Sequence, residues 1–567
     1  MTRVACVEAV VAVLESEGVD TVFGLPGDAV LPLYTALRHS SIRHITVRRQ
    51  AGGAHAADGW ARTTGNVGVC VGASGTNMIT GLHAALADSV PIICVTGQAA
   101  TTKLRQEPLQ AADIVEIAGP VTKWAIQLKE SAQAPWVFRE AFRIARSGRP
   151  GPVLVDLPAD VQRGTCLYDR ALDAPLPVAV PRPLPQVVRA AIDLVCTARR
   201  PLILAGGGVV TAEAGDELLQ LAEHLQIPVQ VTLMGKGAFP EDHPLFAGLA
   251  GTQAHTRWGN AAFLRSDLVL AVGARFGDRH TGELDVYREG RRFVHVDIEP
   301  TQFGRVFEPD LGVFGHARPV LAEMVAEARS RTAALQPGKW VRRVGELRRT
   351  MARRDDFDDV PIKPPRVFRE INDFYPRDTT FVTGTGLHQI WSGQFQTTYL
   401  PRRYLACGQA GPPGWEVPAA MGVKCARPER QVVAVAGCPF LMDEVAAAAR
   451  HRIPFVIVMI NNAGPGPIRQ AELPYDMNDA VDLHDCEGGV DHVRAMESFG
   501  CPARRVERPG DIRDALAWAS AEAARKRLPV LVEVMVEREA KAATGPALDA
   551  IKEFEPLPEL VTVDWSD

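Results

Sequence analysis

Short apolar runs rich in valine and isoleucine recur along the chain, separated by stretches with helical periodicity. Runs of this length bounded by turn residues are typical of strands buried on both faces, as in parallel sheets covered by helices. The pattern predicts an α/β fold of doubly wound parallel sheets. The runs are VGVCVGA at 67–73, PIICVTG at 91–97, PVLVDLP at 152–158, PLILAGGG at 201–208, LVLAVGA at 268–274, FVHVDIE at 293–299, VVAVAG at 432–437, FVIVMINN at 455–462 and PVLVEVMV at 529–536.

Two breaks divide this pattern. Residues 173–185, DAPLPVAVPRPLP, are too rich in proline for a helix or a central strand, and 355–366, DDFDDVPIKPPR, follow a charged helical stretch. A chain of 567 residues is also too long for one hydrophobic core. The sequence therefore predicts three domains, at 1–170, 187–335 and 366–540, with a tail at 541–567.

Composition and charge exclude several classes of protein. Hydrophobic residues make up 46% and charged residues 23%, and no apolar run is long enough to span a membrane, so we expect a globular protein. The net charge of -5 comes with scattered lysines and arginines, which disfavours binding to nucleic acid or acidic membranes. The acidic, helical start does not resemble a signal or transit peptide, so we expect a cytoplasmic location.

The ten cysteines include no C-x-x-C pair. Most of them, such as Cys70, Cys94 and Cys196, lie in apolar runs, where a small buried thiol is the ordinary explanation. We therefore expect neither a disulfide framework nor a zinc site.

Loop segments after the predicted strands resemble one family along nearly the whole chain. The chain resembles the thiamine-diphosphate enzymes of the acetolactate synthase group, and within that group the glyoxylate carboligases. The resemblance implies a pyrimidine-binding domain, a central FAD-binding domain and a diphosphate-binding domain, in dimers or tetramers with active sites between subunits. The segments are FGLPGDAVLPLY at 23–34, AHAADGWAR at 54–62, SGRPGPVLVDLPADVQ at 147–162, TLMGKG at 232–237, GARFGDRHTG at 273–282, VDIEPTQFGRV at 296–306, GQAGPPGW at 408–415 and NNAGPGPIRQ at 461–470.

The central domain retains the flavin-binding features that this resemblance implies. The glycines at 206–208 let backbone N–H groups approach a diphosphate at a helix start, although each position alone could equally be a turn, a packing residue or a surface charge. Taken together they predict FAD binding. The residues are Arg149, from the first predicted domain, and Gly206, Gly207, Thr232, Leu233, Met234, Gly273, Arg275, Arg279, His280, Asp297 and Ile298 of the central domain.

The thiamine-diphosphate site departs from the family pattern. The resemblance implies a divalent cation held by a carboxylate after one strand and by an Asn-Asn turn after the next. Asn461 and Asn462 are present, but Gly437 is followed by Cys438, and sulfur is a mismatched ligand for magnesium. These departures predict that thiamine diphosphate and Mg²⁺ are unlikely cofactors and that the chain has no metal site.

Other departures surround the same ligand. Gln50 stands where a glutamate normally exchanges a proton with the cofactor, although glyoxylate carboligases themselves lack that glutamate. An expected proline-containing insertion after Gly75 is missing, Pro413 replaces a bulky wedge, and Leu109 replaces a phenylalanine.

Three functions follow from these features. The leading hypothesis is a flavoenzyme on a glyoxylate carboligase-like scaffold, with FAD as the reactive cofactor that oxidises or oxygenates a small organic substrate. The alternatives are thiamine-diphosphate-dependent C–C bond formation beside a bystander FAD, and a non-catalytic partner subunit. In each case we expect a homodimer or homotetramer.

Six residues are candidates for the chemistry around the vacated site. His55 could instead be a packing histidine, and Cys438 either a thiol activated at a helix start or a small buried residue. The candidates are Gln50, His55, Gln110, Gln409, Cys438 and Asn462. Arg469 could bind a carboxylate or pair at the surface.

Overall fold

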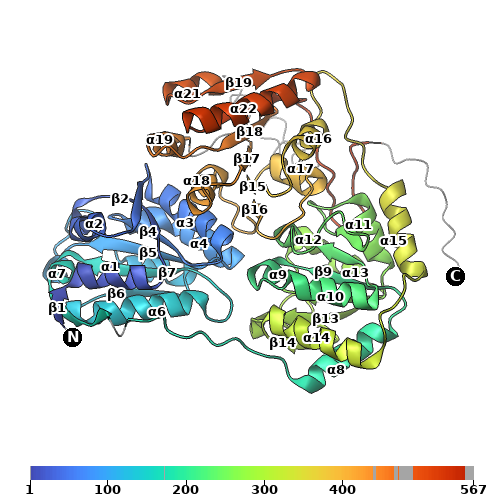
Figure 1. Ribbon diagram of the computed structural model, residues 1–567, viewed down its shortest axis with the longest axis horizontal. Helices are drawn as coiled ribbons and strands as arrows, with labels where there is room; N and C mark the ends of the chain where they lie inside the picture. Colours follow the sequence, from blue (N-terminus) through green and yellow to red (C-terminus); the bar gives the residue numbers. More distant parts are fainter. Residues whose placement is uncertain (1, 171–172, 438–441, 465–469, 471–489, 556–567) are drawn as a thin grey trace.

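The computed structural model describes residues 2–170, 173–437, 442–464, 470 and 490–555. It has three six-stranded parallel sheets with helices on their faces, so the predicted fold class is confirmed. Figure 1 shows the first domain at the left, the central domain at the lower right and the third domain at the top.

The first sheet has the strand order β3-β2-β4-β5-β7-β6. A short antiparallel pair, β1 with β8, lies beside it. The strands are β1 (Thr2–Ala5), β2 (Thr21–Leu25), β3 (Arg43–Thr46), β4 (Gly68–Gly72), β5 (Ile92–Gln98), β6 (Trp124–Gln127), β7 (Val153–Pro158) and β8 (Thr165–Tyr168). The helices are α1 (Cys6–Ser16), α2 (Leu31–Arg38), α3 (Gln50–Thr64), α4 (Ile79–Asp88), α5 (Ile114–Ala118), α6 (Ala134–Arg146) and α7 (Ala159–Arg163).

The central sheet has the order β11-β10-β9-β12-β13-β14. Its strands are β9 (Pro201–Ala205), β10 (Val229–Val231), β11 (Phe246–Leu249), β12 (Leu268–Val272), β13 (Arg292–Asp297) and β14 (Leu311–Phe314). Its helices are α8 (Pro185–Thr197), α9 (Gly207–Thr211), α10 (Gly215–Leu225), α11 (Arg257–Arg265), α12 (Asp278–Thr281), α13 (Leu284–Arg288), α14 (Ala317–Arg331) and α15 (Lys339–Thr350). The strand order reverses between β9 and β12, which is where open α/β sheets bind ligands.

The third sheet has the order β16-β15-β17-β18-β20-β19, with its reversal between β15 and β17. Its strands are β15 (Thr380–Thr383), β16 (Tyr404–Ala406), β17 (Val432–Ala436), β18 (Val456–Asn461), β19 (Ala503–Val506) and β20 (Val530–Met535). Its helices are α16 (Pro364–Phe374), α17 (Leu387–Phe395), α18 (Glu416–Ala426), α19 (Asp443–Arg450), α21 (His492–Ser498) and α22 (Ile512–Lys526).

The first and third domains pack through α3 and α18. A Cβ atom at Gly422 would lie 1.9 Å from the carbonyl oxygen of Ala56, and one at Gly59 would lie 2.3 Å from that of Ala419. Only glycine permits such an approach of two helix backbones. One hydrophobic core therefore extends across both domains, with Trp60 and Trp415 among its members.

Burial confirms most of the cysteine prediction and corrects one part of it. Cys70 and Cys94 are buried, but Cys196 is exposed. Cys196 lies on α8, where Ile192 and Val195 face the core, and an apolar neighbourhood in sequence does not bury every face of a helix.

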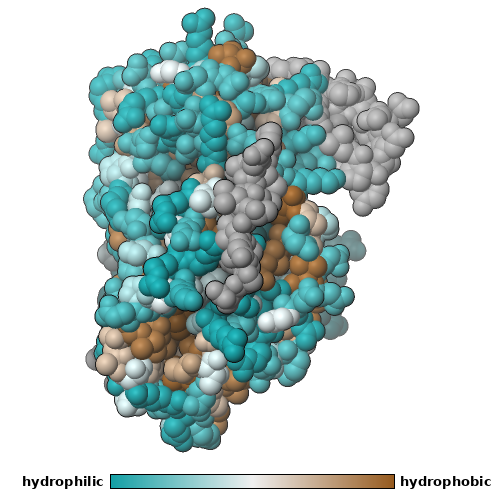
Figure 2. All heavy atoms as spheres, turned by 90° about the vertical axis from the view of Figure 1, so that its right-hand side faces the viewer, coloured by the Kyte–Doolittle hydropathy of each residue, from teal (hydrophilic) through white to brown (hydrophobic). Residues whose placement is uncertain are grey.

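The surface seen in Figure 2 is mainly hydrophilic, with hydrophobic residues in separate patches. Among the described residues, no helix is long and apolar enough to cross a membrane.

Candidate cofactor sites

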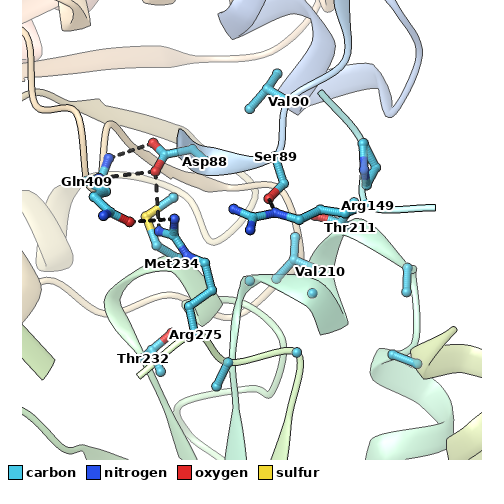
Figure 3. Close-up of a pocket in the computed structure, with 18 of the residues that line it drawn as sticks. Asp88, Ser89, Val90, Arg149, Val210, Thr211, Thr232, Met234, Arg275 and Gln409 are labelled. Carbon is cyan, nitrogen blue, oxygen red and sulfur yellow. Dashed lines mark hydrogen bonds and ion pairs between the residues drawn. The ribbon is translucent and has the colours of Figure 1, made fainter. Parts of the chain in front are cut away.

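A pocket of about 530 Å³ lies between the three domains. The first domain contributes the end of α4 and residues near Arg149, the third contributes Gln389 and Gln409, and the central domain contributes most of the remaining wall. Figure 3 shows the side chains around it. The pocket opens at the carboxyl ends of β9 and β12, at the strand-order reversal of the central sheet.

Glycines bring two strand ends together beside this pocket. The N–H of Gly208 donates to the carbonyl of Gly273 over 3.1 Å, and a Cβ at Gly206 would lie 2.1 Å from the same oxygen. Gly273 has a φ of +60°, a conformation that favours glycine. The absence of side chains exposes backbone to a ligand, as close approach to a diphosphate requires.

The structure gathers the predicted FAD-binding positions around this pocket. Gly206 does not line it and serves the packing of the two strand ends instead. The residues that line it are Arg149, Gly207, Thr232, Leu233, Met234, Gly273, Arg275, Arg279, His280, Asp297 and Ile298.

Arginines give the pocket its positive charge. Arg149 donates from Nε to Ser89 Oγ over 2.7 Å, and the exposed Arg279 donates to Gln253 Oε1 over 3.1 Å. Burial lowers the pKa of Arg149 and of Arg275, which means that their charges are poorly solvated. An anionic ligand would compensate these charges.

His280 is less suited to hold an anion. Its Nε2 lies 2.9 Å from the hydroxyl of Tyr287, and burial lowers its pKa to about 4. The imidazole is therefore neutral near pH 7 and contributes shape and hydrogen bonding.

Asp88 and Arg62 are site residues that the sequence reasoning missed. The Asp88 carboxylate receives Arg62 Nη2 at 3.0 Å, the N–H of Gly408 at 2.7 Å and the N–H of Gln409 at 3.1 Å. Arg275 approaches it to 3.6 Å. Arg62 lies within the segment AHAADGWAR, but Asp88 carries no motif, and only its place between an apolar helix and a buried strand could have drawn attention to it.

A second candidate site lies at the carboxyl edge of the third sheet. His388, in the first turn of α17, is buried, and its Nε2 has no hydrogen-bond partner among the residues that the structure describes. Cβ atoms at Gly386 and Gly437 would lie 2.5 and 2.6 Å from its Nδ1, so the ring packs between two glycines. Burial lowers its pKa to about 4. A helix start, two glycines and the free Nε2 of this imidazole, judged among the described residues, form a surface suited to an anion.

Glu416 lies beside this edge at the start of α18. It is 1% exposed, and within the described part of the chain its Oε2 has no hydrogen-bond partner. A Cβ at Gly384 would lie 1.9 Å from that oxygen, so the glycine makes room for the carboxyl group. Burial raises its pKa to about 7, so Glu416 can hold a proton near neutral pH.

Asn461 and Asn462 stand at the end of β18, as the sequence predicts. Asn461 Nδ2 donates to Glu533 over 2.8 Å, and its Oδ1 accepts from the N–H of Ala463. Asn462 is half-buried at the same edge. Among residues 2–170, 173–437, 442–464, 470 and 490–555, no three His, Cys, Asp or Glu side chains are placed to hold a metal ion.

The structure separates the remaining candidates. Gln50 and His55 share α3, where Gln50 Oε1 accepts from Asn77 Nδ2 over 3.0 Å and the fully buried His55 has its pKa lowered by burial to about 4. Gln110 is exposed in a loop, with a φ of +60°. Gln409 lies at the interdomain pocket. Cys438 and Arg469 lie outside the described residues.

Comparisons with known proteins match all three domains. Residues 5–117 match the thiamine pyrophosphate enzyme N-terminal TPP binding domain, 188–324 the central domain, and 384–534 the C-terminal TPP binding domain. The chain is similar to the glyoxylate carboligase of Escherichia coli O157:H7, with 46% identity covering 98% of this chain and 97% of that protein. It is 38% identical to a probable acetolactate synthase large subunit of Methanocaldococcus jannaschii, covering 94% and 91%, and 37% identical to the acetolactate synthase of Mycobacterium bovis, covering 96% and 91%.

These matches correct the cofactor prediction. Both TPP-binding domains are matched, and the relatives are carboligases and synthases, so the findings point to thiamine diphosphate, and the expectation that it is lost is wrong. The matches do not support a flavin-dependent oxidoreductase or oxygenase and favour the predicted alternative, a carboligase. The flavoenzyme prediction rested on departures from the family pattern at Cys438, Gln50, Pro413 and the loop after Gly75, and Cys438 lies outside the described residues.

Proposed function

Because this chain belongs to the thiamine pyrophosphate enzyme family, we propose that it catalyses thiamine-diphosphate-dependent C–C bond formation between small 2-oxo acids, with glyoxylate as the first substrate to test. In this reaction two glyoxylates give tartronate semialdehyde and CO₂. The observation that carries the proposal is 46% identity to a glyoxylate carboligase over 98% of the chain. The acetolactate synthases at 37–38% identity make pyruvate the second substrate to test.

The edge of the third sheet provides groups that fit thiamine diphosphate. The start of α17 at Gly386 offers backbone N–H groups to a diphosphate. The Nε2 of His388, which bonds to no described residue, offers a further hydrogen bond. Bound thiamine diphosphate supplies the electron sink that decarboxylation of a 2-oxo acid needs. Glu416, whose pKa lies at about 7, would hold a proton beside the diphosphate and so avoid repulsion between two anions.

The interdomain pocket supports a second, non-reacting cofactor. Its volume of about 530 Å³, the backbone exposed at Gly207 and the arginines Arg149 and Arg275 fit an adenine dinucleotide such as FAD. On this proposal FAD binds beside the reaction and takes no part in redox chemistry. The protein acts on small molecules as a homodimer or homotetramer.

Activity with defined substrates tests the proposal. Purified protein is incubated with glyoxylate or pyruvate, with and without thiamine diphosphate and magnesium, and products are followed by NMR and CO₂ release. We expect tartronate semialdehyde only when the cofactor is present, and none with the oxythiamine analogue. If the protein forms acetolactate from pyruvate faster than tartronate semialdehyde from glyoxylate, its activity is that of an acetolactate synthase. No turnover of either substrate, in protein that binds the cofactor, would contradict the proposal.

A further inference from the structure

Asp88 is the point at which all three domains meet. Its side chain, at the end of α4, is completely buried and faces donors from the central and third domains as well as from α3 of its own. Figure 3 shows dashed lines from its carboxylate to Gln409 and to Arg275. A buried carboxylate needs such partners, because removing an unpaired charge from water is costly.

Two of these donors are consecutive backbone amides. Gly408 N–H donates to Oδ2 and Gln409 N–H to Oδ1, over 2.7 and 3.1 Å. Both residues follow β16 in the loop that leads to α18. One carboxylate that accepts from two successive amides fixes the direction of the backbone at the start of this loop.

Arginines tie the same carboxylate to other parts of the loop. Arg62 donates to Asp88 and to the carbonyl of Ala406, and its guanidinium lies 4.9 Å from the ring of Trp415. Arg275, from the pocket wall, donates over 2.7 Å to Gln409 Oε1 and also to the carbonyl of Ala87. Arg62 therefore holds the loop near its two ends, at Ala406 and Trp415. Arg275 holds it at the side chain of Gln409.

The loop itself rests on the edge of the third sheet. Gly411 has a φ of +52°, and a Cβ there would lie 2.6 Å from Thr385 Oγ1. Thr385 directly precedes Gly386 at the start of α17, where the proposed function places the diphosphate. A displacement of the loop would therefore disturb this turn.

We propose that Asp88 is a positioning residue that holds residues 408–411 against the thiamine-diphosphate site, and that Arg275 ties the same loop to the occupant of the interdomain pocket. The inference rests on the proposed function for the identity of the cofactor. The tie between Asp88 and the loop does not depend on it.

The test compares Asp88→Asn with Asp58→Asn. Both carboxylates are completely buried and both bind Arg62, but only Asp88 receives the loop amides. The amide introduced by Asp88→Asn would present an N–H₂ group to the N–H donors of the loop, so one acceptor is lost. Amide hydrogen exchange of a peptide covering 404–415 is measured without cofactor, and the Kd for thiamine diphosphate with magnesium is measured by calorimetry. Thermal melts verify that each variant is folded.

We expect Asp88→Asn to accelerate exchange in this peptide and to weaken thiamine-diphosphate binding, each about tenfold, while Asp58→Asn changes neither. Arg275→Gln leaves the pair of Arg62 and Asp88 intact and should accelerate exchange to a smaller extent. If Asp88→Asn does not fold, this variant tests the inference in its place. Unchanged exchange in these variants, or an equal effect of Asp58→Asn, would overturn the inference. A wild-type protein that binds no thiamine diphosphate would contradict the proposed function alone, because the exchange comparison stands without it.

Discussion

Glu444 Oε1, in the first turn of α19, accepts a hydrogen bond from the backbone N–H of Arg49 over 2.9 Å. The same carboxyl group accepts from the N–H of Arg48, so a side chain of the third domain caps α3 of the first domain. A Cβ at Gly52 would lie 2.2 Å from this oxygen, which leaves no room for a larger residue. The start of α3 is therefore satisfied only when the first and third domains are in contact, so this hydrogen bonding stabilises both the helix and the domain contact.

Removal of this cap should loosen the domain contact. We expect Glu444→Ala to lower the free energy of unfolding by about 2 kcal/mol, because two amides lose their acceptor in a mostly buried place. Glu444→Gln, which keeps one acceptor, should cost less. Denaturant unfolding of both variants measures the difference, and equal stability of Glu444→Ala and wild type would refute the capping role.

The helix contact between α3 and α18 gives a second prediction. We expect Gly422→Ala to destabilise the protein by about 3 kcal/mol or more, because the added methyl group meets the backbone oxygen of Ala56. Gly119→Ala is the matched control, since a Cβ at Gly119 meets no atom within 4 Å. The melting temperatures of the two variants are compared with that of wild type. A similar decrease in melting temperature in both variants would show that the close approach of α3 and α18 does not require glycine at 422.

The nine apolar runs that predict strands correspond to β4, β5, β7, β9, β12, β13, β17, β18 and β20. Several strands without such a run are edge strands, such as β3, β6 and β19, and in the short β10 the buried Gln230 interrupts the pattern. β2 and β15 also lack a run although they lie inside their sheets, because Gly24 in β2 and the threonines at both ends of β15 interrupt the apolar residues. An edge strand has one neighbour and a partly exposed face, so its residues need not be uniformly apolar. The apolar runs therefore predict most interior strands and none of the edge strands.

The pocket was predictable where motifs follow strands, as at Gly207 and Arg275, because strand ends converge at the reversal of strand order. Asp88 was not, since its role depends on amides 320 and 321 residues away. Glu416 was missed for a similar reason, because its burial depends on the space beside Gly384. Residue identity at single positions led to the wrong cofactor, whereas similarity over the whole chain gave the family.

The proposal that FAD binds in the interdomain pocket gives a third prediction. We expect Arg279→Ala to lose bound FAD during gel filtration and to melt at a lower temperature that added FAD restores, because FAD stabilises only the native state. Arg318→Ala, an exposed arginine paired with Glu217, is the control. Flavin absorbance and thermal melts with and without FAD measure both effects. A variant that keeps its flavin and melts like wild type would contradict the placement of Arg279 at the ligand.

Glu416 should make stability depend on pH. Burial raises its pKa from 4.5 to about 7, so the folded state binds the proton more tightly than the unfolded state. The stability due to this proton is therefore present below pH 4.5 and is lost as the pH rises through 7. We expect Glu416→Gln to be more stable than wild type by up to about 3 kcal/mol at pH 8 and nearly equal to it at pH 4. Unfolding of the two proteins across this range measures the difference, and a constant difference would contradict a titrating Glu416.

Glu533 should show the opposite dependence. Its carboxylate accepts from His492 Nδ1, Arg505 Nε and Asn461 Nδ2 over 2.7, 2.7 and 2.8 Å, and these partners outweigh the effect of burial and lower its pKa to about 2. The folded state therefore favours the ionised form, and this stabilisation is present above pH 4.5 and is lost as the pH falls toward 2.

Glu533→Gln tests this dependence, because it keeps the shape of the side chain and removes its charge. We expect a loss of about 2 to 3 kcal/mol at pH 7 that shrinks steadily between pH 4.5 and 2. Glu497→Gln, at an exposed position on α21, should leave stability nearly unchanged at every pH. Urea unfolding at several pH values measures all three proteins. A loss that stayed the same from pH 7 to pH 3 would mean that packing, and not the charge of Glu533, holds β18, β19 and β20 together at this edge.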